Sequence, residues 1–288
     1  MKKSRFTITT THYILFSFLT AILVGSVLLT LPISSASGQA TPFIDALFTA
    51  TTATCVTGLV VVPTVTAWSL FGQIVILVLI QIGGLGIITI MASITVFLHR
   101  RMCLADRLLL RDAFNLNTLS GLEVFVKKVI KGTLVIEGIG ACIYMTVFVP
   151  QFGLKGIWIS VFTSISAFCN AGIDIIAENS LCNYTLNPII NITTCLLIIL
   201  GGLGYIVWWD FMRVSKEKRT KKVKFWRTLT LHSKIVIGAT AVLILVGGIL
   251  ILLFEYNNPN TLGGYSFMEK VEAALFQSVT TRTAGFAT

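Results

Sequence analysis

Long apolar runs separated by short polar segments dominate this chain. Each run is about 20 residues or longer, the length that a helix needs to cross the hydrocarbon core of a bilayer. The pattern predicts spanning helices over residues 13–31, 70–98, 124–149, 187–211 and 234–254. Hydrophobic residues make up 55% of the sequence and charged residues 12%, where soluble domains usually have about 25% charged residues. A soluble globular protein is therefore excluded.

Three shorter segments between these runs resemble one another. They read PFIDALFTATTATCVTGL over 42–59, WISVFTSISAFCNAGI over 158–173 and EKVEAALFQSVTTRTAGF over 269–286. Each combines a short apolar helix that carries a Phe, a hydroxyl-rich turn, and a glycine followed by an apolar residue. The glycines, Gly58, Gly172 and Gly285, are 114 and 113 residues apart, so the chain is an internal repeat.

The helix in each short segment cannot cross a membrane. At about 1.5 Å per residue, the helix over 42–53 reaches about half-way through the hydrocarbon core, so we expect it to be re-entrant. Non-helical backbone at that depth must be buried in protein or line a water-filled cavity. A glycine can adopt positive φ and turn successive carbonyls toward one axis, and a carbonyl ring can replace the hydration shell of a monovalent cation. The segments are therefore predicted to be pore helices with ion-filter turns.

The predicted fold is an all-α polytopic membrane protein with parallel membrane–pore–membrane repeats and re-entrant pore helices around a central pore. Repeat 1 covers 1–98, a cytoplasmic connection follows over 99–123, repeat 2 covers 124–212, a basic cytoplasmic connection covers 213–233, and a partial repeat 3 covers 234–288. We expect the rest of repeat 3 and a fourth repeat to be missing, so the chain looks incomplete. For the run at 13–31, a cleaved signal peptide is the alternative to a retained helix.

The net charge of +10 follows the expected topology. All but three of the 22 Lys and Arg residues lie in the N-terminal tail, in 100–131 or in 213–234. The positive-inside rule places these blocks, and therefore the N-terminus, on the cytoplasmic side. The basic block over 216–224 is interpreted as a topology and lipid-surface signal. Nucleic-acid binding is not expected, because no basic motif is interleaved with aromatic residues.

Other polar and small residues within the apolar runs give weaker signals. The clusters Gly83-Gly-Leu-Gly86 and Gly201-Gly-Leu-Gly204 predict close helix packing. Glu137 is an acid within a spanning run, and a functional and a structural role are both open for it. Cys55 and Cys169 precede their glycines by three residues, and both are expected to pack behind the turn. The chain has no His-Glu-x-x-His or Gly-x-Ser-x-Gly motif, so an enzyme is not expected.

The glycine turns resemble the first three selectivity-filter turns of the Trk/Ktr/HKT superfamily of potassium transporters. The Gly-Gly-Leu-Gly clusters and basic connections extend this resemblance over the whole chain, which is most similar to the Ktr-type membrane subunit. The resemblance implies channel-like potassium uptake across the plasma membrane by a homodimer with cytoplasmic, nucleotide-binding RCK-type regulatory subunits. It implies no cofactor in this chain, with nucleotide bound by the partner, K⁺ as the transported ion and Na⁺ as the candidate symported ion. An alternating-access cation carrier is the alternative.

The resemblance also carries over filter residues. These are Thr54, Cys55, Val56, Thr57 and Gly58 in the first turn, Phe168, Cys169, Asn170, Ala171 and Gly172 in the second, and Thr281, Arg282, Thr283, Ala284 and Gly285 in the third. Backbone carbonyls at the three glycines would bind K⁺. Arg282 is expected to point away from the pore axis and to pair with Glu272 or Asp174.

Overall fold

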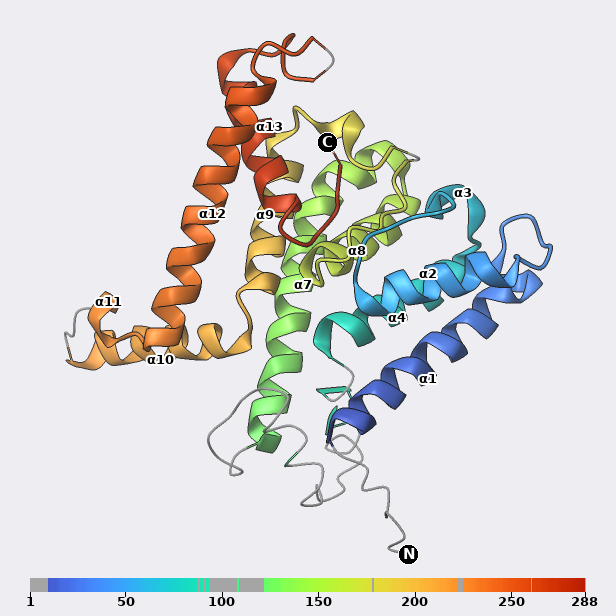
Figure 1. The fold of residues 1–288 in the computed structure, drawn as a ribbon, viewed down its shortest axis with the longest axis horizontal. Coiled ribbons are helices and arrows are strands. Elements are labelled where there is room, and N and C mark those ends of the chain that lie inside the picture. Colours follow the sequence, from blue (N-terminus) through green and yellow to red (C-terminus); the bar gives the residue numbers. More distant parts are fainter. Residues whose placement is uncertain are drawn as a thin grey trace, which may run out of the picture. The chain divides into compact units, whose positions relative to one another are not determined.

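The computed structural model describes residues 10–86, 89–90, 92–93, 108, 122–177, 179–221, 225–259 and 261–287 (Figure 1). Within these residues, helices are the regular elements, and the β contact is an isolated bridge between Ser35 and Trp68. The predicted all-α fold is confirmed. The chain divides into two compact units, residues 1–138 and 139–288.

The first unit is built around a short helix between two apolar ones. Its elements are α1 (Thr10–Thr30), η1 (Pro32–Ser34), α2 (Phe43–Cys55), α3 (Thr64–Ala67) and α4 (Leu70–Leu85). Helix α2 packs against α1 and α4, which also contact each other (Figure 1). Small residues permit this approach, since a Cβ on Gly25 of α1 would lie 2.7 Å from Leu79 Cδ1 and 3.4 Å from Ala50 Cβ.

The second unit repeats the combination of a short helix with longer apolar helices. Helix α7 (Leu122–Phe152) enters this unit from the first. It is followed by α8 (Lys155–Phe168), η2 (Cys182–Tyr184), α9 (Pro188–Gly202), α10 (Tyr205–Lys221), α11 (Phe225–Thr228), α12 (Leu231–Glu255) and α13 (Phe267–Thr280). Helix α8 packs against α9, and α13 packs against both α9 and α12. The short helices α8 and α13 therefore both contact α9.

Two of the described helices, α7 and α12, are each long and apolar enough to cross a bilayer. Helix α9 and the part of α10 up to Glu217 are together long and apolar enough to form a third span. The two helices are, however, bent by 96° at the break between them. Three other apolar helices among the described residues are shorter than these spans: Ile14–Thr30 of α1, α4 and α8. Helix α7 also continues past Pro150, where the sequence predicted an end, and stops before Gly153 at φ +60°.

The helix predicted over 187–211 is interrupted, and this prediction was wrong. Helix α9 ends at Gly202 and α10 begins at Tyr205, with Gly204 at φ +80° between them. Helix α4 ends in the same way before Gly86 at φ +79°, well inside the predicted range 70–98. A helix cannot continue through a residue with this backbone conformation, and glycine adopts it without steric cost.

Some predicted segments fall on residues that the structure leaves undescribed. Of the helix predicted over 70–98, residues 87–88, 91 and 94–98 lie outside the described residues. Of the cytoplasmic connection over 99–123, only 108, 122 and 123 are described. In the basic connection over 213–233, residues 222–224 lie outside the described residues.

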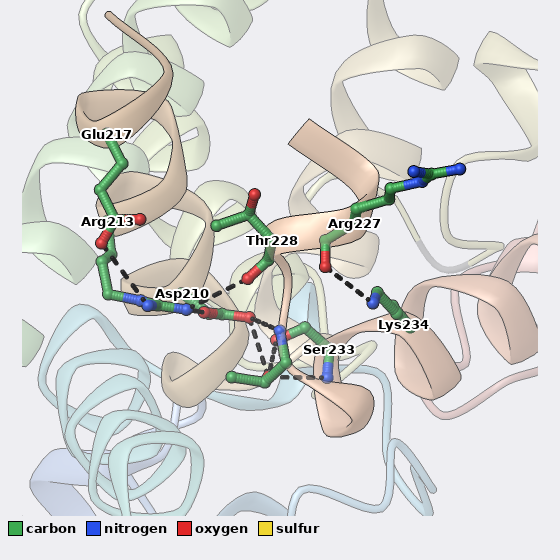
Figure 2. Close-up of polar contacts among 8 residues, drawn as sticks. Asp210, Arg213, Glu217, Arg227, Thr228, Ser233 and Lys234 are labelled. Carbon is green, nitrogen blue, oxygen red and sulfur yellow. Dashed lines mark hydrogen bonds and ion pairs between the residues drawn. The ribbon is translucent and has the colours of Figure 1, made fainter. Parts of the chain in front are cut away.

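Asp210 ties α10 to the start of α12 (Figure 2). Its side chain is buried and accepts hydrogen bonds at 2.8 Å from both the backbone N–H and the hydroxyl of Thr230. Arg213 Nη2 lies 2.6 Å from the same carboxylate. Thr230 caps α12, because its hydroxyl accepts from the backbone N–H of Ser233 at 3.3 Å. One carboxylate therefore links α10 to the residue that caps α12.

We expect Asp210→Ala to lower the apparent melting temperature of the purified protein in detergent. The substitution leaves the Thr230 N–H without its acceptor and removes the 2.6 Å ion pair of Arg213, and a hydrogen bond to a charged group is worth about 1.5–3 kcal/mol. Glu217→Ala is the control, because it removes a 3.6 Å contact to Arg213 from an exposed partner, and such contacts contribute less than about 1 kcal/mol. Equal losses in the two variants would contradict this role of Asp210.

Candidate functional site: three glycine turns

Three short helices, α2, α8 and α13, are 13, 14 and 14 residues long. Each ends in a turn that contains one of the repeated glycines. Gly58 has φ +76°, Gly172 has φ +65° and Gly285 has φ +86°. The structure therefore gives the three glycines the backbone conformation that a non-glycine residue rarely adopts. Their role in ion selection stays a prediction.

The first two turns share a second unusual backbone residue. Val56, two residues before Gly58, closes α2 in the left-handed conformation with φ 56° and ψ 46°. Asn170 occupies the same place before Gly172, with φ 60°. Asn tolerates this conformation, but for a β-branched residue such as Val it costs about 1–3 kcal/mol. The surrounding structure must stabilise the first turn against this strain.

The second and third turns lie directly against each other in the second unit. A Cβ on Gly172 would lie 1.8 Å from the carbonyl oxygen of Ala284, so only glycine fits there. The chain beyond each turn is also paired, because the Leu181 N–H donates to the Ala287 carbonyl at 2.9 Å. The Ala287 N–H in turn donates to Ser180 Oγ at 3.4 Å. Two of the three predicted turns are therefore adjacent.

The arginine of the third turn does not pair as predicted. Arg282 Nη2 donates to Thr240 Oγ1 on α12 at 3.3 Å. Glu272, one expected partner, accepts instead from Asn191 Nδ2 at 3.0 Å, and Asp174 bonds residues of its own loop. The expected ion pair was wrong because a neighbouring hydroxyl supplies an acceptor for the guanidinium group.

The glycine clusters bring α4 and α9 against the ends of the short helices. A Cβ on Gly83 would lie 2.1 Å from the Thr54 carbonyl oxygen, and a Cβ on Gly201 would lie 1.8 Å from that of Phe168. The predicted close packing is therefore confirmed at these two positions. The last glycine of each cluster ends its helix, which was not predicted from the sequence although both clusters finish with the same residue.

The structure also places Glu137 and the two cysteines of the turns. Glu137 is buried on α7 and accepts from Gln81 Nε2 of α4, at 3.1 and 3.3 Å to its two oxygens, so within the first unit it joins α4 to the first part of α7. Cys169 is buried, but Cys55 is exposed, so the prediction that both pack behind their turns was wrong for Cys55. Among the described residues, no cluster of three or more His, Cys, Asp or Glu side chains could hold a metal ion.

Comparisons with known proteins bear on this arrangement. A family model described as TrkH, cation transport protein, matches residues 3–288. The potassium/sodium uptake protein NtpJ of Enterococcus hirae is 42% identical over 270 residues, which are 93% of this chain and 57% of that protein. The Ktr system potassium uptake protein B of Bacillus subtilis is 41% identical over 270 residues, covering 93% and 58% of the two chains. This chain therefore spans little more than half the length of these relatives.

A solved structure has a similar fold. The crystal structure of the potassium transporter TrkH from Vibrio parahaemolyticus matches with a TM-score of 0.68 at 18% sequence identity. The match covers 98% of this chain and 53% of that chain. At this identity the likeness concerns the fold, and it extends over nearly all of the present chain.

Proposed function

Because this chain belongs to the TrkH family of cation transport proteins, we propose that it forms part of a channel-like potassium uptake protein of the plasma membrane. The observation that carries the proposal is the set of three short helices that each end in a turn with a positive-φ glycine. The names of the relatives, which are potassium uptake proteins, support K⁺ as the ion. They are transporters by name, which also supports transport over catalysis.

The turns would select the ion through backbone carbonyls. The C-terminal ends of α2, α8 and α13 carry the negative end of each helix dipole, which attracts a cation to the turns. Carbonyls at Gly58, Gly172 and Gly285 would then replace the water around a K⁺ ion. The adjacent second and third turns support a shared site, since the Ala284 carbonyl lies against Gly172. The alternating-access carrier is not favoured.

The proposal also covers the number of repeats around the pore, the subunits of the transporter and a second ion. Repeats 1–98, 124–212 and 234–288 would contribute three quarters of one ring, with the N-terminus in the cytoplasm and a fourth turn in the longer protein. A relative named as part of a Ktr system supports a multi-component transporter. We extend this to a homodimer with cytoplasmic, nucleotide-binding RCK-type subunits. The name of the potassium/sodium relative supports Na⁺ as a second ion.

The test is potassium and sodium flux into liposomes. We compare the 288-residue chain with the chain extended through its natural reading frame. We expect only the extended chain to take up K⁺, because three turns cannot enclose an ion. Selective uptake by the short chain would mean that several copies assemble the ring, and it would overturn the proposal of one pore in each complete chain. The absence of K⁺ uptake by the extended chain, incorporated with its regulatory subunits, would overturn the proposed function.

A further inference from the structure

We propose that one hydroxyl at the end of each short helix clamps the glycine turn and thereby sets its ion selectivity. The three residues are Thr52 on α2, Ser166 on α8 and Thr280 on α13. Their side chains are buried, and each bonds to the residue that directly follows the repeated glycine. This role presupposes the potassium filter proposed above and adds positioning residues to it.

In the second and third turns the hydroxyl holds a carbonyl. Ser166 Oγ donates to the carbonyl oxygen of Ile173, and Thr280 Oγ1 donates to that of Phe286 at 2.8 Å. Ile173 and Phe286 are themselves buried, so each carbonyl is removed from water and needs this partner. Each carbonyl is directed toward the end of its short helix. The run of carbonyls that can face an ion therefore ends at the glycine in both turns.

In the first turn the equivalent hydroxyl holds an amide. Thr52 Oγ1 accepts from the Leu59 N–H at 3.0 Å and lies 2.5 Å from the hydroxyl of Thr57. The residue that is held is again the one after the glycine. The first turn therefore has the same anchor point as the others, with the opposite hydrogen-bonding direction.

The same three residues also hold, through their backbone carbonyls, an N–H group at the glycine or one residue before it. The Thr52 carbonyl accepts from the Thr57 N–H at 3.0 Å, and the Ser166 carbonyl accepts from the Ala171 N–H at 2.8 Å. In the third turn the Thr280 carbonyl accepts from the N–H of Gly285 at 3.2 Å. One residue thus holds the backbone of its turn at two points close to the glycine. A turn held at two points has less freedom to adjust its carbonyls to a smaller ion.

The spacing explains why the sequence does not reveal these anchors. The hydroxyl residue precedes the residue it holds by seven positions in the first two turns but by six in the third. An alignment on the glycines therefore places Val279, and not Thr280, opposite Thr52 and Ser166. The equivalence is visible only in the hydrogen bonds.

The test is Thr280→Val in the complete protein, because valine has the shape of threonine without its hydroxyl. We expect the ratio of K⁺ to Na⁺ uptake into liposomes to fall about tenfold, the factor that corresponds to the loss of one hydrogen bond. Thr280→Ser, which keeps the hydroxyl, should retain the ratio. Thr163→Val is the matched control on α8, since Thr163 Oγ1 is buried and has no hydrogen-bond partner among the described residues. It should leave the ratio unchanged.

An unchanged ratio in Thr280→Val would overturn the inference. If Gly172→Ser lowers the ratio in the same assay while Thr280→Val does not, the filter stands and the hydroxyl clamp fails. If neither variant changes it, the filter proposal fails as well. Should Thr280→Val not insert into the membrane, Ser166→Ala is measured with the same readout, and an unchanged ratio there overturns the inference.

Discussion

Gly172→Ser in the complete protein is expected to lower the ratio of K⁺ to Na⁺ uptake by more than tenfold. Two physical effects combine at this position. A serine would have to adopt φ +65°, which costs a non-glycine residue about 1 kcal/mol or more. Its Cβ would also lie 1.8 Å from the Ala284 carbonyl oxygen and 2.7 Å from the carbonyl carbon. The backbone of the third turn must move, so one substitution disturbs two adjacent turns.

Gly153→Ser separates these two effects. Gly153 has φ +60°, close to that of Gly172, but a Cβ there would have no heavy atom within 4 Å. It lies between α7 and α8, outside the turns. We expect the Gly153→Ser variant to take up K⁺ and Na⁺ in the same ratio as the wild type when equal amounts of protein are incorporated into liposomes. An equal loss of selectivity in both variants would indicate a general effect of backbone strain and would contradict the role assigned to Gly172.

Gly201→Ala is expected to destabilise the protein by about 3 kcal/mol, the upper end of the usual cost of overpacking, because the added atom meets rigid backbone. The added Cβ would lie 1.8 Å from the Phe168 carbonyl oxygen and 2.9 Å from its carbon. Both partners are backbone, so neither can rotate away, and α9 must shift from the end of α8. The apparent melting temperature in detergent measures this loss.

The neighbouring glycine provides a matched control. At Gly202 the nearest atom to an added Cβ is Asn170 Nδ2 at 3.7 Å, an ordinary van der Waals contact. Alanine in a helix is favoured over glycine by about 0.5–1 kcal/mol, so Gly202→Ala should be neutral or slightly stabilising. A large loss of stability is thus expected at the first of two consecutive glycines and none at the second. A similar loss in both would contradict the contact between α9 and α8.

Local signals in the sequence allowed the short helices to be predicted. The structure begins α2 at Phe43, one residue after the predicted start at Pro42, because Pro42 occupies the cap position. Helix α13 begins at Phe267, two residues before the predicted segment, because a capping box that was not used in the prediction starts it there, in which the Ser266 N–H donates to Glu269 at 2.8 Å. The glycine spacing marked the turns, since few other residues tolerate positive φ.

Features that depend on contacts between distant residues were not predictable in this way. A glycine in an apolar run can serve packing or end a helix, and the two clusters do both, with Gly201 packing and Gly204 ending α9. The sequence also suggests a charged partner for Arg282, but α12 supplies Thr240. Charge complementarity predicts which groups attract each other but not which side chain the fold brings near.

The most direct test of the central claim measures K⁺ and Na⁺ uptake into liposomes by the complete protein and by three variants, Gly58→Ser, Gly172→Ser and Gly285→Ser. If the three turns form one potassium filter, the wild type prefers K⁺ and each variant loses much of that preference while still inserting into the membrane. An unchanged preference for K⁺ in all three variants would contradict the account, because ion selection would then lie outside these turns.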